Sequence, residues 1–239
     1  MPREIIAHRG YSAIAPENTL AAFAAAIAHR ANSIEFDVQL SSDGIPVIIH
    51  DPTLERTTNG SGFVREKTLE QLKALDAGAW FNPEFSGERI PSLSEALKAI
   101  EDLDRFVYPE VKGAENWTDA DVDRFVQILI ETGWEDRCIV ACFNEKFLER
   151  VRERSRQIIL GFLVPSASKF TEKLPLAAAD GNAIMLSQYN VLLTNPSLVA
   201  TSRNLRIDIG VWTVDNREDL QKLLEIGVVR IVTNSLIRY

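Results

Sequence analysis

The sequence contains three histidines, and two of them lie where a catalytic group could act. His8 and His50 each end a short apolar run, whereas His29 lies late in an alanine-rich helical segment, where attraction to the helix C-terminus would explain it. Because an imidazole titrates at about pH 6.5, one histidine can remove a proton while the other donates one. From the sequence alone, a structural role for His8 or His50 is an equally good interpretation.

Three carboxylates have the spacing of a metal site. Glu35 and Asp37 are two residues apart in Ser-Ile-Glu-Phe-Asp-Val, and alternate side chains of a strand share one face. They would repel each other and lose solvation unless a cation lies between them, although a solvent-facing edge strand would also explain them. Glu110 ends a later apolar run. Oxygen ligands without cysteine fit Mg²⁺ or Ca²⁺ better than structural zinc.

Two cations accompany these groups. Arg9 directly follows His8, and Lys112 follows Glu110 by two residues, on the same face of the expected strand. Cations beside a metal and two histidines indicate an anionic substrate, most simply a phosphate. Each cation could instead be the structural partner of a carboxylate, which is the preferred interpretation for an isolated residue.

The elements that must position these residues follow a repeating pattern of a β-branched run and an amphipathic segment. The runs predict nine strands, at residues 5–8, 33–38, 46–50, 105–111, 137–142, 157–163, 183–186, 209–214 and 229–233. The amphipathic segments predict helices over residues 17–29, 92–100, 118–131, 145–154 and 217–225. Ser92 and Glu95 fit a capping box at the start of one of these helices.

Strands that alternate with helices predict parallel βα units. The exception is the pair at 33–38 and 46–50, because its connection is shorter than the dozen or more residues of a parallel crossover, so this pair is expected to be antiparallel. Removing the return strand leaves eight strands. We therefore predict an α/β fold, a (β/α)8 TIM barrel in a single domain over residues 1–239, with an open doubly wound sheet as the alternative.

One region, from about residue 52 to residue 91, departs from the alternation. It combines turn signals such as Asn59-Gly60 with several aromatic residues and one helical stretch over residues 69–75. An insertion of this length in a compact barrel is commonly functional, for example as a lid. A peripheral excursion with its own small core is the alternative, and the sequence favours neither.

Composition and charge exclude several classes of partner. The chain has 34 acidic and 26 basic side chains, a net charge of −8 and a pI near 5.0, which argues against nucleic acid and against attraction to anionic membranes. No apolar run approaches the roughly 18 residues of a membrane span, and the N-terminus lacks the apolar core of a signal peptide. Cys138 and Cys142 would be roughly 13 Å apart on one strand, too far for a disulfide, so we expect reduced cysteines and a cytoplasmic protein.

Several segments share their order and spacing with a known family. The first four are His8-Arg9-Gly10, Pro16-Glu17-Asn18-Thr19, Ile34-Glu35-Phe36-Asp37-Val38-Gln39 and Asp43-Gly44-Ile45-Pro46-Val47-Ile48-Ile49-His50-Asp51. The later ones are Arg56-Thr57-Thr58-Asn59-Gly60, Leu75-Asp76-Ala77-Gly78, Ile90-Pro91-Ser92-Leu93, Glu110-Val111-Lys112, Phe143, Val211-Trp212-Thr213-Val214 and Ile231-Val232-Thr233-Asn234. Together they resemble the glycerophosphodiester phosphodiesterase family, densely to about residue 112 and more thinly afterwards.

The resemblance implies a TIM barrel with an insertion after the second histidine. It implies hydrolysis of small-molecule glycerophosphodiesters to sn-glycerol 3-phosphate and an alcohol, through a cyclic phosphate that forms when the glycerol 2-hydroxyl attacks phosphorus. It also implies that Glu35, Asp37 and Glu110 hold one divalent cation, Mg²⁺ or Ca²⁺, and that His8 and His50 are the acid–base pair.

The resemblance extends to the substrate contacts. It implies that Arg9 and Lys112 bind the phosphate, and that Trp212 packs against the glycerol moiety with Phe143 also at the substrate. Asn18 supports the loop of the first histidine or, with equal weight, is a residue that starts a helix.

Two positions depart from the family pattern. Arg230 stands where members often have an aspartate or a small residue, which affects local packing beyond the catalytic set. Ala141-Cys142-Phe143-Asn144 replaces the usual Ser-Phe, so Cys142 is expected to line the pocket and to alter its polar contacts.

Three other functions are compatible with parts of the pattern. A phosphatidylinositol-type phospholipase C has the barrel and paired histidines but acts on membranes, which the acidic pI does not favour. A non-catalytic phospholipid-headgroup binder would not need both histidines. A metal-dependent aldolase-type barrel would use the carboxylates but would leave the histidines and cations unexplained.

Overall fold

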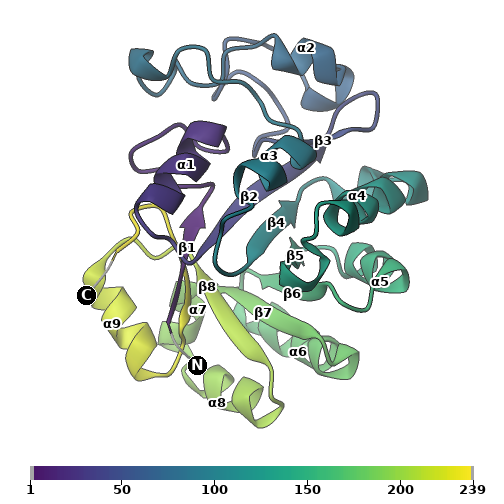
Figure 1. The fold of residues 1–239 in the computed structure, drawn as a ribbon. Coiled ribbons are helices and arrows are strands. Elements are labelled where there is room, and N and C mark those ends of the chain that lie inside the picture. Colours follow the sequence, from purple (N-terminus) through teal and green to yellow (C-terminus); the bar gives the residue numbers. More distant parts are fainter. Residues whose placement is uncertain (1–2, 238–239) are drawn as a thin grey trace.

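The centre of the computed structural model, which describes residues 3–237, is a closed ring of eight parallel strands (Figure 1). Those strands are β1 (Glu4–His8), β2 (Ser33–Leu40), β4 (Val107–Val111), β5 (Ile139–Cys142), β6 (Ile159–Val164), β7 (Ala183–Gln188), β8 (Asp208–Trp212) and β9 (Arg230–Thr233). β1 pairs in parallel with both β9 and β2, and this second pairing closes the sheet. The predicted TIM barrel is therefore confirmed, and the open-sheet alternative is wrong.

The ninth strand, β3 (Pro46–Ile48), lies outside the barrel. It runs antiparallel to the end of β2, with Val38 opposite Ile48 and Leu40 opposite Pro46. The prediction of a return strand is thus confirmed, and all nine strands begin and end within two residues of their predicted limits. β3 matters for the site because it leads the chain directly to His50.

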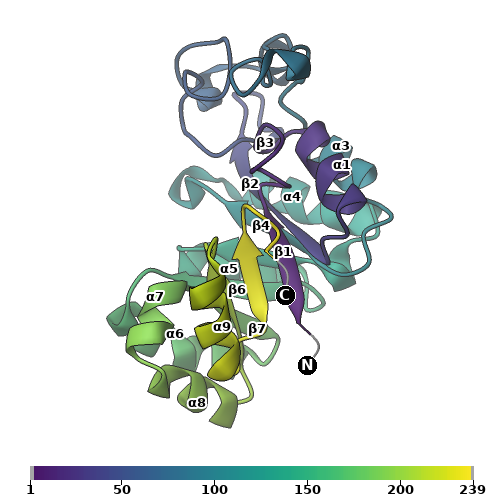
Figure 2. The same ribbon diagram turned by 90° about the vertical axis from the view of Figure 1, so that its left-hand side faces the viewer.

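All five predicted helices of the barrel are present and cover its outside (Figures 1 and 2). They are α1 (Leu20–Ala28), α3 (Leu93–Ala99), α4 (Asp119–Glu131), α5 (Glu145–Arg154) and α9 (Arg217–Glu225). The capping box of Ser92 and Glu95 is confirmed. α1 begins later than predicted, because Asn18 has a positive φ of 59° and the side chain of Thr19 accepts the hydrogen bond that caps the helix.

Three further helices lie where no helix was predicted. They are α6 (Ala167–Asp180), α7 (Tyr189–Thr194) and α8 (Ser197–Asn204). α6 contains Pro175, which removes one helical hydrogen bond and disguises the pattern, while Asn195 and Pro196 separate two helices that are short individually. Packing against β6, β7 and β8 therefore stabilises helices with weak local signals.

Apolar side chains form two layers, one inside the barrel and one between the barrel and its helices. The inner layer is small and contains Ile6, Tyr108, Ile139, Ala141, Leu163, Ile184, Leu186 and Val232. Glycines make room for it: a Cβ on Gly161 or Gly210 would come within 2.8 or 2.7 Å of the Leu186 side chain. Cys138 and Cys142 are both buried and unpaired in the outer layer, as predicted.

The segment between β3 and α3 forms a small unit beyond the carboxyl ends of β1 and β2, next to α1 (Figures 1 and 2). Its short helices are η1 (Val64–Glu66), α2 (Leu69–Lys73) and η2 (Pro83–Phe85). Two further 3-10 helices, η3 (Ala114–Asn116) and η4 (Glu135–Arg137), lie outside this segment. The segment packs with Val47 of β3 into a core of its own, which also contains Ile49, Leu54, Val64, Leu72, Ala77 and Ile90. It stands beside the face of the barrel where the strands end.

At the opposite end of the barrel lies a group of polar side chains, most of them buried, that we call the Arg230 network. Its members are Glu4, Ser33, Tyr108, Asp208 and Arg230. Arg230 donates hydrogen bonds to the Glu4 carboxylate, to the Tyr108 hydroxyl at 2.8 Å and to Asp208 Oδ2 at 3.2 Å. The departure that the sequence showed at Arg230 is therefore accommodated by acidic partners on neighbouring strands.

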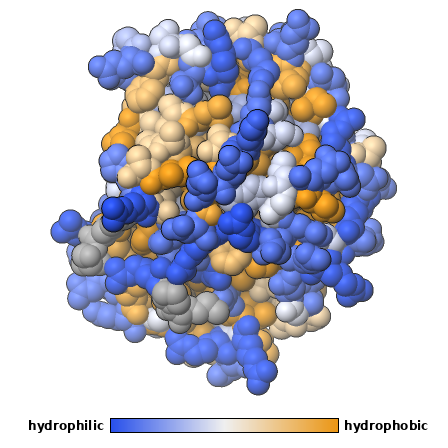
Figure 3. All heavy atoms as spheres, viewed as in Figure 1, coloured by the Kyte–Doolittle hydropathy of each residue, from blue (hydrophilic) through white to orange (hydrophobic). Residues whose placement is uncertain are grey.

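Figure 3 shows hydrophilic side chains over most of one face, with apolar side chains gathered over the alanine-rich α1. No helix among residues 3–237 combines the length and the apolar character needed to cross a bilayer.

Candidate active site

A cavity of about 290 Å³ opens where the barrel strands end. Its walls contain eight of the ten residues that the sequence predicted for the site: His8, Arg9, Glu35, His50, Glu110, Lys112, Phe143 and Trp212. The remaining wall and floor are formed by Tyr108, Ala141, Leu163, Leu186, Thr213 and Val232. Charged groups therefore lie on one side of the cavity and apolar groups on the other. The two other predicted residues, Asp37 and Asn18, lie directly behind the charged side.

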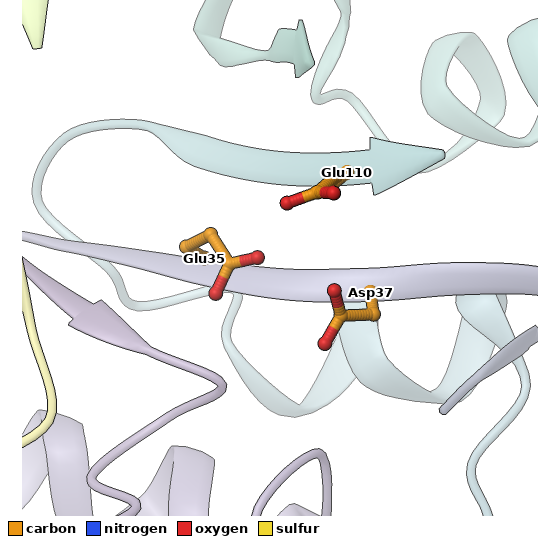
Figure 4. Close-up of side chains that lie close together, drawn as sticks. All are labelled: Glu35, Asp37 and Glu110. Atoms are coloured by element: carbon orange, nitrogen blue, oxygen red, sulfur yellow. The ribbon is translucent and has the colours of Figure 1, made fainter. Parts of the chain in front are cut away.

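Glu35, Asp37 and Glu110 point toward one another from β2 and β4 (Figure 4), and we call them the carboxylate cluster. The parallel register places Asp37 opposite Glu110, and two residues of strand separate Glu35 from Asp37 on the same face. One oxygen from each of the three lies within 4.8 Å of the others. Glu35 and Asp37 are almost fully buried, so the cluster is not the solvent-facing edge that the sequence allowed.

The three carboxylates do not share one electrostatic environment. Burial, together with the charges of Asp37 and Glu110, raises the pKa of Glu35 well above its usual value of 4.5. Burial and Asp37 likewise raise the pKa of Glu110. Burial alone would raise the pKa of Asp37 as well, but Lys112 and Arg9 lower it to about 2. Asp37 is therefore ionised at neutral pH, whereas burial and the neighbouring negative charges disfavour the ionised forms of Glu35 and Glu110.

The cluster fits a hard divalent cation. Glu35 Oε1 is buried and has no hydrogen-bond partner among the described residues, which is costly unless something else satisfies it. All three donors are carboxylate oxygens, the ligands that Mg²⁺ and Ca²⁺ prefer. The donor set does not discriminate between these two metals.

Arg9 is placed by an unusual backbone conformation. Its φ of 55° lies in the left-handed region, which costs a non-glycine residue roughly 1–2 kcal/mol. The turn lets the Arg9 backbone N–H donate to Glu35 Oε2 at 2.9 Å, while Nε lies 3.2 Å from Asp37 Oδ2 and Nη1 donates to Glu17 at 2.7 Å. Arg9 thus pairs with carboxylates and also lines the cavity.

Lys112 is placed similarly on the other side of Asp37. Its Nζ lies 3.0 Å from Asp37 Oδ1 and also bonds Glu110. Although burial opposes the charge, Asp37 and Glu110 raise the pKa of Lys112 to about 12. Both predicted phosphate-binding cations are therefore paired with carboxylates, the alternative that the sequence left open, and both remain on the cavity wall.

His8 is oriented by residues from the end of the chain. Its Nδ1 lies 2.7 Å from Asn234 Oδ1, and Asn234 in turn donates to Asp215 through its side-chain amide at 2.5 Å. Because an amide oxygen only accepts hydrogen bonds, the His8 Nδ1 atom has the proton. The other ring nitrogen, Nε2, lies 3.9 Å from Glu35 Oε2. Burial and then Arg9 lower the pKa of His8 below its usual 6.5.

His50 is oriented by its own neighbour. His50 Nδ1 lies 2.6 Å from Asp51 Oδ1, and Asp51 is held by Arg56. The backbone around His50 is fixed by Gln39, whose side-chain amide donates to the carbonyl of His50 at 2.9 Å. The two histidines therefore have partners of different charge, a neutral amide for His8 and a carboxylate for His50.

Asn18 supports Asp37 as well as the loop after the first histidine. Its side-chain amide donates to Asp37 Oδ2 at 2.8 Å, its carbonyl oxygen accepts from the Asp37 backbone at 3.2 Å, and its own backbone N–H donates to the Arg9 carbonyl at 3.0 Å. The helix that follows is capped by Thr19 rather than by Asn18. The supporting interpretation of Asn18 therefore describes its contacts better than the helix-start interpretation.

Two aromatic side chains form the apolar wall. Phe143 and Trp212 meet edge to face with ring centres 6.1 Å apart, and Trp212 Nε1 donates to the Leu186 carbonyl at 3.2 Å. The prediction that Cys142 lines the pocket is wrong: Ala141 does so, and Cys142 Sγ is turned into the core, 3.4 Å from the Val111 carbonyl. A side chain one position along a strand faces the other way.

The sequence did not identify the residues that hold the site together. Glu17, Asp51 and Arg56 stand within or beside segments already noted, and Asn234 ends the last of them, so a signal was present. Their contacts were invisible, because 226 residues separate His8 from Asn234 and 39 separate Glu17 from Arg56.

Comparisons with known proteins agree with this geometry. Residues 8–237 match the model of the glycerophosphoryl diester phosphodiesterase family. The chain is 36% identical over 230 residues to a glycerophosphodiester phosphodiesterase of Caldanaerobacter subterraneus, covering 96% of this chain and 93% of that one. It is similar to the structure of an Oleispira antarctica phosphodiesterase in complex with the product sn-glycerol-3-phosphate, with a TM-score of 0.89, 30% identity, and 97% and 93% coverage. It is also similar to a glycerophosphodiester phosphodiesterase of Agrobacterium tumefaciens, with a TM-score of 0.84, 27% identity, and 99% and 98% coverage.

Proposed function

The chain belongs to the glycerophosphoryl diester phosphodiesterase family and is a phosphodiesterase, and from this premise we propose its mechanism and the roles of its residues. The reaction is hydrolysis of a small glycerophosphodiester to sn-glycerol 3-phosphate and an alcohol, with one divalent cation and two histidines. One observation supports this proposal above all others: His8, His50 and two members of the carboxylate cluster line one cavity, and the third member lies directly behind them.

The carboxylate cluster is the proposed site of the cation. Glu35, Asp37 and Glu110 would hold it, and a bound Mg²⁺ or Ca²⁺ would offset negative charge on the phosphate oxygens. Arg9 and Lys112 are proposed to contact the phosphate from either side of Asp37. Since each is already paired with carboxylates, both would be positioned before substrate arrives.

The histidines are proposed to move the protons. One imidazole takes the proton from the glycerol 2-hydroxyl as that oxygen attacks phosphorus, and the other donates a proton to the departing alcohol oxygen. The product of this step is a cyclic phosphate, and water then opens it with the two imidazoles exchanging roles. His8 Nδ1 and His50 Nδ1 are both engaged by fixed partners, which leaves each Nε2 for this chemistry.

The aromatic wall is proposed to bind the glycerol moiety. Trp212 and Phe143 offer apolar surface opposite the charged side of the cavity, so a molecule with a phosphate at one end and carbon-bound hydrogens at the other would have one orientation.

We also propose that residues 1–239 act as one barrel domain, with residues 52–91 as its insertion, in the cytoplasm. The two unpaired buried cysteines are compatible with a reducing compartment.

The test is release of sn-glycerol 3-phosphate from glycerophosphocholine, with and without EDTA, followed by separate addition of Mg²⁺ and Ca²⁺. We expect release that EDTA abolishes and that at least one metal restores. A cyclic phosphate as the final product would favour the phospholipase C alternative. Metal-dependent binding without turnover, for this and a panel of other headgroups, would favour the headgroup binder.

Replacement of His50 tests the proton-transfer role directly. We expect His50→Ala to lower kcat/KM by about a thousandfold or more, since general acid–base catalysis contributes roughly 10²–10⁴-fold per group. His29→Ala is the matched control, because His29 is exposed at the end of α1, and it should stay within about twofold of wild type. A His50→Ala enzyme within about tenfold of wild type would remove His50 from the mechanism.

A further inference from the structure

Arg56 occupies a connecting position between the insertion and the cavity. It lies in the 52–91 segment, outside the cavity wall, and its guanidinium binds two carboxylates at once. Nη1 and Nη2 each donate to Glu17 at 2.8 Å, and Nε and Nη2 donate to Asp51 at 2.5 and 3.0 Å. This use of the guanidinium depends on its planar fork, which a lysine does not have.

Each of those carboxylates holds a residue of the cavity with one of its oxygens. Glu17 Oε1 accepts from Arg9 Nη1 at 2.7 Å, and Asp51 Oδ1 lies 2.6 Å from His50 Nδ1. A continuous chain of charged hydrogen bonds therefore runs from Arg9 through Glu17, Arg56 and Asp51 to His50. We call Glu17, Arg56 and Asp51 the Arg56 clamp.

The Arg56 clamp is expected to contribute little to the free energy of unfolding. Arg56 is 43% exposed, and exposed ion pairs contribute little to the free energy of unfolding. Arg56 does, however, fix the orientation of the Asp51 carboxylate. Among the described residues, that carboxylate has no hydrogen-bond partner other than His50 and Arg56. Without Arg56, Glu17 and Asp51 would repel each other, and Asp51 could turn toward solvent and away from His50.

The charge state of the clamp agrees with this geometry. The hydrogen bond from Arg56, followed by that from His50, lowers the pKa of Asp51, although partial burial opposes the shift. Asp51 is therefore ionised throughout the range in which histidine titrates, and it accepts from His50 Nδ1 in that whole range.

We propose that Arg56 is a positioning residue of the hydrolytic site, which fixes His50 through Asp51. The 52–91 segment is then part of the catalytic apparatus rather than a peripheral excursion. The inference rests on the proposed role of His50, since Arg56 acts through that side chain and does not line the cavity.

The kinetic test compares Arg56→Ala and Arg56→Lys with Arg152→Ala. Arg152 makes the same two-bond contact with a carboxylate, to Asp180 at 2.7 and 2.9 Å, at the far ends of α5 and α6. We expect both Arg56 variants to lower kcat for glycerophosphocholine by about 10- to 100-fold, as a misplaced catalytic group does. KM should change by less than about threefold, since Glu17 still holds Arg9. Arg152→Ala should leave kcat within about twofold of wild type.

Two further readouts separate positioning from a general structural effect. Added guanidinium ion should raise kcat of Arg56→Ala by about threefold or more, because it can bind between Glu17 and Asp51 in place of the missing side chain. It should not affect kcat of Arg152→Ala. In ¹⁵N spectra of the three histidines, the His50 ring signals should move in Arg56→Ala while those of exposed His29, the internal reference, stay in place.

The outcomes distinguish this inference from the function on which it rests. If His50→Ala is nearly as active as wild type, the proposed function fails. If His50→Ala is inactive while both Arg56 variants keep kcat and KM within about twofold and show unchanged His50 signals, the positioning role alone is overturned. Recovery of full activity by Arg56→Lys would also overturn it, because the charge without the fork would then suffice.

Discussion

The barrel contains two groups of charged side chains, one near each end, and each combines buried carboxylates with an arginine. The Arg230 network lies where the strands begin, and the carboxylate cluster with Arg9 and Lys112 lies where they end. Tyr108 is common to both regions, since its ring lines the cavity and its hydroxyl bonds Glu4 and Arg230. The difference between the two groups is in how completely each carboxylate is satisfied.

In the Arg230 network the most buried carboxylate has all its bonds. Glu4 accepts from Ser33 at 2.5 Å and from Tyr108 at 3.0 Å on one oxygen, and from Arg230 on the other. Arg230 also lies over the Phe106 ring, 5.4 Å from its centre. Arg230 Nε is buried without a hydrogen-bond partner among the described residues, but the Glu4 carboxylate is fully satisfied. A buried carboxylate with a complete set of partners is typical of a structural element.

In the carboxylate cluster, by contrast, the hydrogen bonds of a buried carboxylate are incomplete. Three carboxylates face two cations, and Glu35 Oε1 has no hydrogen bond from any described residue. Burial and like charge raise the pKa of Glu35 and of Glu110, which a stable fold alone would not require. An unsatisfied buried carboxylate therefore marks the place where a ligand is expected, and a satisfied one marks structure.

The largest effect that this comparison predicts is on activity. Glu35→Gln removes a proposed ligand and one of three repelling charges, so we expect kcat/KM to fall by about a thousandfold or more, because a metal contributes several kcal/mol to charge stabilisation. The free energy of unfolding measured in EDTA should be equal to or higher than that of wild type, since repulsion is relieved. A fall in stability comparable to that of an Arg230 variant would contradict the distinction between the two groups.

The reverse result is expected at the other end of the barrel. Arg230→Met leaves Glu4 buried without its cation, so the free energy of unfolding should fall by about 3–5 kcal/mol in urea titrations. Glu4→Gln in the same chain should restore part of that loss, because it removes the unpaired charge. The folded fraction of either protein should keep kcat/KM within about threefold of wild type, and a larger loss would show that the network takes part in catalysis.

The alternation of strands and helices was enough to predict the barrel. The short connection between residues 40 and 46 identified β3 as the return strand, and the Ser92–Glu95 capping box marked the start of α3. The α6 helix could not be predicted, because Pro175 conceals a pattern that only packing on β6 and β7 stabilises. Local rules therefore determined the order of elements, and long-range packing determined the rest.

The site was predictable where residue type and strand alternation suffice. Glu35, Asp37 and Glu110 follow from alternation and parallel pairing, and His8 and His50 from their positions at strand ends. The partners of those residues were not predictable, since the bonds of Asn234 to His8 and of Arg56 to Glu17 join distant parts of the chain. The prediction for Cys142 was wrong because it did not apply alternation: Ala141 and Cys142 face opposite sides of β5, and Ala141 lines the cavity.

The smallest effect concerns Tyr108, which both groups share. Tyr108→Phe removes two hydrogen bonds of the Arg230 network, those of the hydroxyl with Glu4 and Arg230, and keeps the ring in the cavity floor. We therefore expect the free energy of unfolding at pH 8 to fall by about 1–2 kcal/mol. Activity should change by less than about threefold.

The pH dependence of that loss gives a sharper test. Burial and then Glu4 raise the pKa of Tyr108 well above its usual value of 10, so above that pH the unfolded chain releases a proton that the folded chain retains. Wild-type stability is therefore complete below about pH 10 and falls as pH rises, by up to about 1.4 kcal/mol per pH unit from this group. Phenylalanine cannot ionise, so the difference between the two proteins should be smaller at pH 11 than at pH 8 in urea titrations. Equal differences at both pH values would mean that the Tyr108 hydroxyl ionises as freely in the folded chain as in water, contrary to its place in a closed network.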